Sequence, residues 1–208
     1  MKIHALILTS TIAACTEPGA DAPGDETEII TTVKLTFAPE DGSAPISASF
    51  RDPDGDGGMS GTTDPLALAA GMTYAMQVEF LDELGTPTEN ITREIEEEAE
   101  AHQVFVLGGA VAGPAATDSA AAIADHMYTD LESDYGANTG DDLPVGLINT
   151  ITTRAAGTGE LVIVLRHMPE LNGQPQKVAG LAEQLAAGDA LPGEVDANVT
   201  FDLDLTVQ

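Results

Sequence analysis

Residues 199–207, which read VTFDLDLTV, alternate apolar and polar side chains along their whole length. Valine, phenylalanine and leucine fill one set of positions, and threonine and aspartate fill the other. Successive side chains of a β-strand point to opposite faces of a sheet, so this period of two is typical of a strand with one buried face. The stretch therefore predicts a half-buried strand of an antiparallel sheet, because such sheets commonly expose one face to water.

The same period of two recurs through most of the chain. It is found in residues 29–37, 46–50, 74–80, 145–151 and 161–167, and residues 104–107 form a short apolar run. Seven or so short strands separated by Gly, Pro and Asp turns predict an all-β fold, an antiparallel two-sheet sandwich with an immunoglobulin-like layout. Helices do not alternate with strands, so a doubly wound α/β sheet is not expected.

Two segments depart from this period and predict short helices in the connections between strands. Residues 91–101 are rich in glutamate, and acidic side chains favour the first turns of a helix. Residues 175–187 carry Val178, Leu181 and Leu185 at helical spacing, with Gly188 placed to end the helix. We expect both helices to belong to one β-sandwich domain that spans residues 29–208.

The charge balance restricts the partners that the chain can bind. It has 35 acidic and 7 basic residues among 208, which gives a formal net charge of -28. Binding to phosphates requires clustered Lys and Arg, so nucleic acid and anionic lipid surfaces are not expected as electrostatic partners. Cations are the natural counter-charges of this protein, and its 43% of hydrophobic residues is enough for a packed core.

The first 28 residues predict export and anchoring. Residues 1–14 begin with a basic residue, continue with a short apolar segment and end in Ala13 and Ala14, directly before Cys15, the only cysteine. This arrangement resembles the bacterial lipobox, which implies a lipoprotein signal peptide, cleavage before Cys15 and lipidation of its thiol. Residues 15–28 then form an acidic tether rich in Pro, Gly and Ala. The alternative is an ordinary secretory signal followed by a chance cysteine.

A short acidic segment predicts a calcium site. Asp52, Asp54 and Asp56 occupy alternate positions and are followed by Gly57, which resembles the opening of a calcium-binding loop. A complete EF-hand loop would place Glu at its twelfth position, where this chain has Thr63, so the match is partial. The alternative is an acidic β-turn, because Asp and Gly dominate turns without any ion.

A helical stripe suggests a second metal site. Ile91, Ile95, Glu98 and His102 are spaced by four, three and four residues, so on one helix they would share a face. An acid and a histidine one turn apart can both bind a transition metal. The alternative is a solvated acidic helix with His102 capping its C-terminal end, where the helix dipole favours a cation.

The histidine count extends this hypothesis. His4 would leave with the signal peptide, so the mature chain keeps His102, His126 and His167. These three histidines together with Glu98 would suit Zn²⁺, or Cu²⁺ as the second choice. Chance also supplies three scattered histidines in a chain of this length, and the spacing by itself does not separate the two interpretations.

Several motifs in a fixed order carry a family resemblance. They are TEIITTV at 27–33, FRDPDGDG at 50–57, IT at 91–92 with glutamates at 94 and 96–98, HQ at 102–103, LRH at 165–167 and VTFD at 199–202. Over roughly the whole mature domain the chain resembles a family of small bacterial lipoproteins that genomes often label "type 1 periplasmic binding fold superfamily protein". The resemblance implies an envelope lipoprotein and no established catalytic residues. The bilobed α/β fold in that label does not suit this length or pattern, so a sandwich is still expected.

These observations favour a binding protein over an enzyme. The sequence contains no Gly-x-Ser-x-Gly elbow, no phosphate-binding loop and no His-Glu-x-x-His motif. The leading hypothesis is a protein lipid-anchored in the bacterial cell envelope, at the outer membrane, that binds a divalent metal ion and presents it, or a partner, there. An envelope protein or a metal-uptake receptor would be that partner. The alternative is a structural or adhesive sandwich module that contacts another envelope protein, with calcium only rigidifying a loop.

Overall fold

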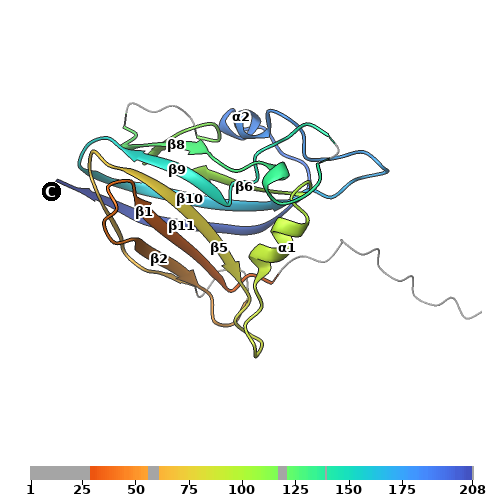
Figure 1. Cartoon of the computed structure of the whole chain (residues 1–208), viewed down its shortest axis with the longest axis horizontal. Helices are drawn as coiled ribbons and strands as arrows, with labels where there is room; N and C mark the ends of the chain where they lie inside the picture. Colours follow the sequence, from red (N-terminus) through yellow and green to blue (C-terminus); the bar gives the residue numbers. More distant parts are fainter. Residues whose placement is uncertain (1–28, 56–60, 117–120, 139, 208) are drawn as a thin grey trace, which may run out of the picture.

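The computed structural model of the protein describes residues 29–55, 61–116, 121–138 and 140–207. The expected signal peptide, Cys15 and the tether lie outside the described residues, and so does Asp56. Strands make up 47% of the structure, and they form two curled sheets (Figure 1). None of the helices in the described part of the chain combines the length and the apolar character needed to cross a membrane.

The larger sheet has seven strands and is antiparallel except at one edge. Its strands, in spatial order, are β3 (Thr62–Thr63), β2 (Ile46–Arg51), β1 (Thr32–Pro39), β5 (Thr73–Leu81), β9 (Ile148–Thr153), β8 (Ala124–Tyr128) and β7 (Val111–Ala112). The pair of β7 and β8 is parallel, and the other pairs are antiparallel. All of its strands come from residues 32–153, whereas the C-terminal strand of the described chain belongs to the other sheet.

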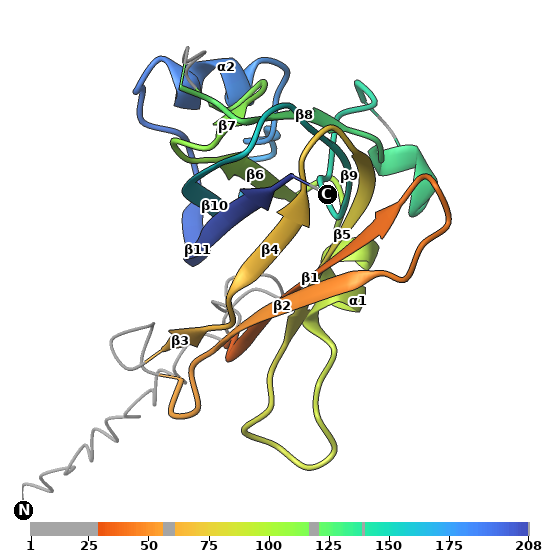
Figure 2. The same cartoon turned by 90° about the vertical axis from the view of Figure 1, so that its left-hand side faces the viewer.

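The smaller sheet has four strands and positions the candidate site. Its strands, in spatial order, are β4 (Leu66–Ala69), β11 (Glu194–Thr206), β10 (Gly157–His167) and β6 (His102–Leu107). Strand β10 pairs with β11 from Gly157 to His167, with one bulge between Leu165 and Arg166, and β4 joins β11 in parallel. Figure 2 shows the strands of the two sheets as separate layers.

The core lies between the two sheets and follows the alternation of the sequence. In β11, Val199, Phe201, Leu203 and Leu205 are buried, while the residues between them are exposed. They meet apolar side chains of the larger sheet such as Phe37. The prediction of an all-β sandwich is confirmed. The seven-plus-four strand order does not confirm an immunoglobulin-like layout within it.

Both predicted helices form, but they are shorter than the sequence pattern suggests. Helix α1 covers Ile91–Glu97 instead of residues 91–101, because Glu98 leaves the helical conformation and the chain turns into β6 at His102. Helix α2 covers Leu181–Ala186 instead of residues 175–187, because Gly180 before it has a left-handed φ of 87°. A short 3-10 helix, η1 (Glu132–Asp134), also lies in a connection.

Helix α2 covers the outer face of the smaller sheet and so buries β6 from both sides. Leu181 and Ala182 of α2 pack with Phe105 of β6 and Val164 of β10 in a second apolar cluster (Figure 2). Strand β6 is consequently buried at every position from His102 to Val106. This explains the continuous apolar run of residues 104–107, since a strand covered on both faces does not need to alternate.

Candidate metal centre

Two histidines face each other where β6 begins and β10 ends. His102 and His167 are directly opposite in the antiparallel register of these strands. They lie on the same faces of their strands as Val104 and Leu165, which belong to the core between the sheets. The two imidazole rings stack with centroids 4.4 Å apart and planes 6° apart. His102 is fully buried, and His167 is 7% exposed.

Helix α1 brings a carboxylate to this pair. The helix is held against β5 by buried Ile91 and Ile95 and by Thr92, whose Oγ1 accepts from the Phe80 amide at 2.8 Å and donates to the Phe80 carbonyl at 3.1 Å. The residue after the helix is Glu98, and its amide closes the last turn. Glu98 therefore lies at the start of the short turn that leads from α1 into β6. Figure 1 shows α1 at the end of the molecule where β6 starts.

The three side chains form a group that could hold a metal ion. One ligand atom from each of Glu98, His102 and His167 lies within 4.8 Å of the others. Glu98 Oε2 is 3.9 Å from His167 Nε2, and the Glu98 side chain is 50% exposed. Within the part of the chain that the structure describes, no other three His, Cys, Asp or Glu side chains come together in this way.

The hydrogen bonding of His102 determines which of its nitrogens is free. Its Nδ1 lies 3.2 Å from the carbonyl oxygen of Glu98, which can only accept, so Nδ1 carries the proton. Its Nε2 then has a lone pair, and this atom is buried without a hydrogen-bond partner, as is Nε2 of His167. Histidines that bind metals almost always donate their other N–H in this manner. The bond to Glu98 is also the helix-capping contact that the alternative interpretation of the sequence expected.

Burial keeps His102 in the form that a metal requires. The pKa of His102 is lowered to about 4, first by desolvation and then by the nearby His167, with a weaker contribution from Lys177 and an opposing effect of the Glu98 carbonyl. A neutral imidazole is the metal-binding form. His102 is therefore ready to bind a metal at neutral pH without losing a proton.

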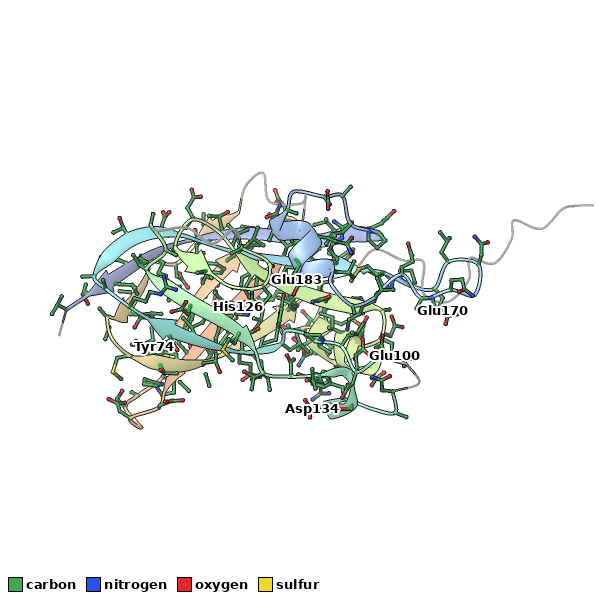
Figure 3. The ribbon with its side chains drawn as sticks, turned by 90° about the horizontal axis from the view of Figure 1, so that it is seen from above. Tyr74, Glu100, His126, Asp134, Glu170 and Glu183 are labelled. Carbon is green, nitrogen blue, oxygen red and sulfur yellow. The ribbon has the colours of Figure 1, made fainter. Side chains whose placement is uncertain are left out.

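A groove opens beside this group. It has a volume of about 690 Å³, and Glu98 and His167 both belong to its wall. Its other acidic lining residues are Glu96, Glu97, Glu100, Glu132, Asp141 and Glu170. Figure 3 shows Glu100 and Glu170 at one end of the molecule and Tyr74 at the other. The candidate metal group thus lies where negative charge is concentrated.

A buried ion pair fixes the turn between α1 and β6. Lys177 Nζ lies 2.7 Å from Glu132 Oε1 and donates to the carbonyl oxygen of Ala99 at 2.8 Å. The Lys177 and Glu132 side chains are 0% and 4% exposed, and Asn138 donates to the other Glu132 oxygen at 2.9 Å. The pair therefore holds Ala99 and, with it, the neighbouring Glu98.

The structure does not bring His126 to the group. This histidine lies on β8 of the larger sheet, and its Nε2 is 2.8 Å from Asn149 Oδ1. Its ring meets that of Tyr128 edge to face at 4.7 Å. Burial lowers the pKa of His126, while Asn149 and Asp130 oppose this shift. Figure 3 shows it between the two ends of the molecule.

The described part of the expected calcium loop forms a turn. The amide of Gly55 donates to the carbonyl oxygen of Asp52 at 3.2 Å, and Gly55 has a left-handed φ of 66°. Asp52 is buried, Asp54 is exposed, and Asp56 lies outside the described residues. Calcium binding by these three aspartates stays a prediction.

Sequence reasoning missed Lys177 and Glu132. They are distant from each other in the chain, and no periodic pattern connects their two segments. The one available signal was rarity, because Lys177 is one of only 7 basic residues in a strongly acidic chain. Its partner could not be identified among 35 acidic residues without the tertiary structure.

Comparisons of the chain with family models, with curated proteins and with solved structures find no match. The resemblance to envelope lipoproteins stays a prediction from the sequence.

Proposed function

We propose that this protein binds a divalent transition metal ion through Glu98, His102 and His167, and that it does so as a lipid-anchored protein of the bacterial envelope. One observation carries the proposal. The imidazoles of His102 and His167 are stacked and buried, and Nε2 of each makes no hydrogen bond. A carboxylate oxygen of Glu98 lies within 4.8 Å of one ligand nitrogen of each histidine. Leaving such polar atoms buried and unpaired is costly, and a shared metal ion would satisfy them.

The type of ligand favours zinc, with copper as the second choice. Imidazole nitrogen suits both metals, and one carboxylate completes a set of three protein ligands that is common for zinc. Ligand atoms held tetrahedrally at about 2.0–2.2 Å from zinc lie about 3.3–3.6 Å from one another. The group must therefore contract on binding, and the half-exposed Glu98 side chain is the part that is free to move.

Metal titration tests the proposal directly. We expect zinc to bind tag-free protein with one-to-one stoichiometry in isothermal titration calorimetry. His102→Ala and His167→Ala should each weaken binding by about 100-fold or more, since even residues that only support a ligand contribute on the order of 10–100-fold. His126→Ala is the matched control, because His126 is also buried but lies outside the group. Tight binding that survives both substitutions would place the metal among the surface acids.

The envelope part of the proposal is supported by the sequence of the first 28 residues. Ala13 and Ala14 precede the single Cys15, and an acidic tether follows. Replacing Cys15 by Ala should move the protein from the membrane fraction to the soluble fraction, because the lipidated thiol would be lost. A variant that stays with the membrane after fractionation would contradict lipid anchoring without affecting the metal site.

A further inference from the structure

The groove beside the candidate metal centre combines negative charge with a buried imidazole nitrogen that has no hydrogen-bond partner. His167 is 7% exposed, belongs to the groove wall and has no hydrogen-bond partner for its Nε2. Glu97, Glu100 and Glu170 of the same wall are exposed carboxylates. The buried imidazole and the acidic carboxylates are independent features, and both belong to the lining of the same groove.

The one cationic side chain of the described wall does not offset this charge. Lys177 is bound to Glu132 at 2.7 Å and to the carbonyl oxygen of Ala99 at 2.8 Å, and its side chain is fully buried. Its charge is therefore neutralised within the wall. The field inside the groove is set by the exposed carboxylates, and walls of low dielectric concentrate such a field.

The groove also offers apolar surface. Its lining includes Leu143, Met168, Pro169, Pro175 and Val178. Its volume of about 690 Å³ lies within the range of about 300–1,000 Å³ that is usual for pockets binding small molecules. A ligand with a short apolar body fits these walls, whereas an anion would be repelled by them.

The metal group itself leaves room for one more ligand. Three protein ligands occupy three of the four positions that zinc prefers, and the fourth stays open. Glu98 and His167 both line the groove, whereas His102 is fully buried behind them. A fourth ligand must therefore approach from the groove.

We infer that the groove binds a small organic cation that has a short apolar body and donates an imidazole or amine nitrogen to the metal. The inference rests on the proposed metal site and adds the class of ligand that completes it. The nitrogen occupies the open position, the apolar body lies along the wall, and a second, positively charged group faces Glu97 and Glu100.

Two matched probes test the inference on the zinc-loaded full-length protein. One is 1-(3-aminopropyl)imidazole, which carries an ammonium group, and the other is 1-propylimidazole, which has the same imidazole and arm without the charge. We expect calorimetry at low salt to show roughly tenfold tighter binding of the cationic probe, and the preference to shrink in high salt. Neither probe should bind in the groove without zinc.

Substitutions outside the metal group locate the charge effect. The double variant Glu97→Gln, Glu100→Gln should bind zinc normally and lose most of the preference for the cationic probe. The control variant Glu160→Gln, Asp204→Asn removes the same charge from exposed positions on β10 and β11 that do not line this groove, and it should keep the preference.

Each outcome decides between the inference and the function beneath it. Normal zinc binding with equal affinity for the two probes, or with binding of neither, would overturn the inference and leave the metal site standing. A preference that both double variants lose equally would also overturn it, because the effect would then come from overall charge. Failure to bind zinc at all would overturn the proposed function and the inference together.

Discussion

The His102–His167 pair and the His126–Asn149 pair are two buried polar sites in the same sandwich. Each of the three histidines is at most 7% exposed, and each has one ring nitrogen without a hydrogen bond. Their neighbours differ. His102 and His167 stack on each other beside the carboxylate of Glu98, whereas His126 contacts the side-chain amide of Asn149.

This difference shows that burial and a missing hydrogen bond do not by themselves mark a metal site. A metal ion needs several donor atoms that converge. Such a group forms in the smaller sheet, where β6 begins and β10 ends. The larger sheet gives His126 a single neutral partner. We therefore propose metal binding for the first site, which could hold an ion, and a packing role for the second.

The largest effect is expected from breaking the Lys177–Glu132 ion pair, which holds the turn between α1 and β6 at the first site and does not contact the second. Lys177→Met should cost about 3–5 kcal/mol of unfolding free energy, because it leaves Glu132 buried without its counter-charge. It should also weaken zinc binding, since the Ala99 carbonyl next to Glu98 loses its donor. Urea unfolding and zinc calorimetry measure the two effects.

Lys34→Met is the control for this substitution. Lys34 pairs with Glu79 at the same distance of 2.7 Å, but the two side chains are 40% and 29% exposed, so the loss should stay below about 1 kcal/mol. The double variant Lys177→Met, Glu132→Leu should recover part of the stability, because no lone buried charge remains. Similar losses in the two lysine variants would contradict the positioning role of Lys177.

Acid should affect the first site next most strongly. The pKa of His102 is lowered to about 4 in the folded protein from an ordinary value of 6.5. A depressed histidine pKa means that its contribution is present above pH 6.5 and is lost as the pH falls toward 4, because the unfolded chain then binds more protons. Metal-free protein should lose about 3 kcal/mol over this interval from His102 alone.

Comparing two phenylalanine variants by urea unfolding between pH 7.5 and 4 isolates this effect. His102→Phe keeps an aromatic ring beside His167 and should remove the loss that His102 causes. His126→Phe should remove a smaller loss, because Asn149 and Asp130 both favour the protonated form of His126. An unchanged acid response in His102→Phe would mean that this imidazole does not resist protonation.

Breaking the second site should have a moderate effect on stability alone. Asn149→Ala removes the partner of His126 Nε2 and the amide that donates to the Gly146 carbonyl at 2.7 Å. Leaving a buried group unsatisfied costs about 1–3 kcal/mol. Thermal or urea unfolding should show this loss, while zinc affinity stays at the wild-type value. A weakened zinc site in this variant would mean that the two sites are coupled.

The smallest predicted effect concerns a carboxylate with buried oxygens, Asp196, which is not part of the candidate metal group. Both oxygens of Asp196 on β11 are buried without a hydrogen bond, and burial, assisted by Glu194, raises its pKa from 3.8 to about 6. Its contribution to stability is thus fully present below pH 3.8 and is lost as the pH rises through 6. Asp196→Asn should be about 1 kcal/mol more stable than wild type at pH 8, after allowance for partial exposure. The advantage should vanish below about pH 4 in urea unfolding.

Much of the sandwich could be predicted from the sequence, because alternation is a local property. The period of two in residues 199–207 follows from strand geometry, and the structure buries Phe201 and Leu203 as expected. The continuous apolar run of residues 104–107 did not indicate which face is buried. Both faces are covered, and the second is covered by α2, which comes from a distant part of the chain. Helix α1 was predicted too long because glutamate-rich sequence favours a helix beyond Glu97, whereas the chain turns there before β6 begins at His102.

The candidate site was likewise predicted only in part from the sequence. The sequence predicted that Glu98 and His102 lie close together, but on one helix, which was wrong because His102 begins β6; it also predicted that His167 ends a strand on an apolar face. Only the tertiary structure decided that His102 pairs with His167 and that His126 contacts Asn149 instead. It also decided that Lys177 holds the turn between α1 and β6. The reason is that local periodicity fixes which face a side chain occupies, whereas strand register and buried ion pairs depend on which distant segments come together to fill one core.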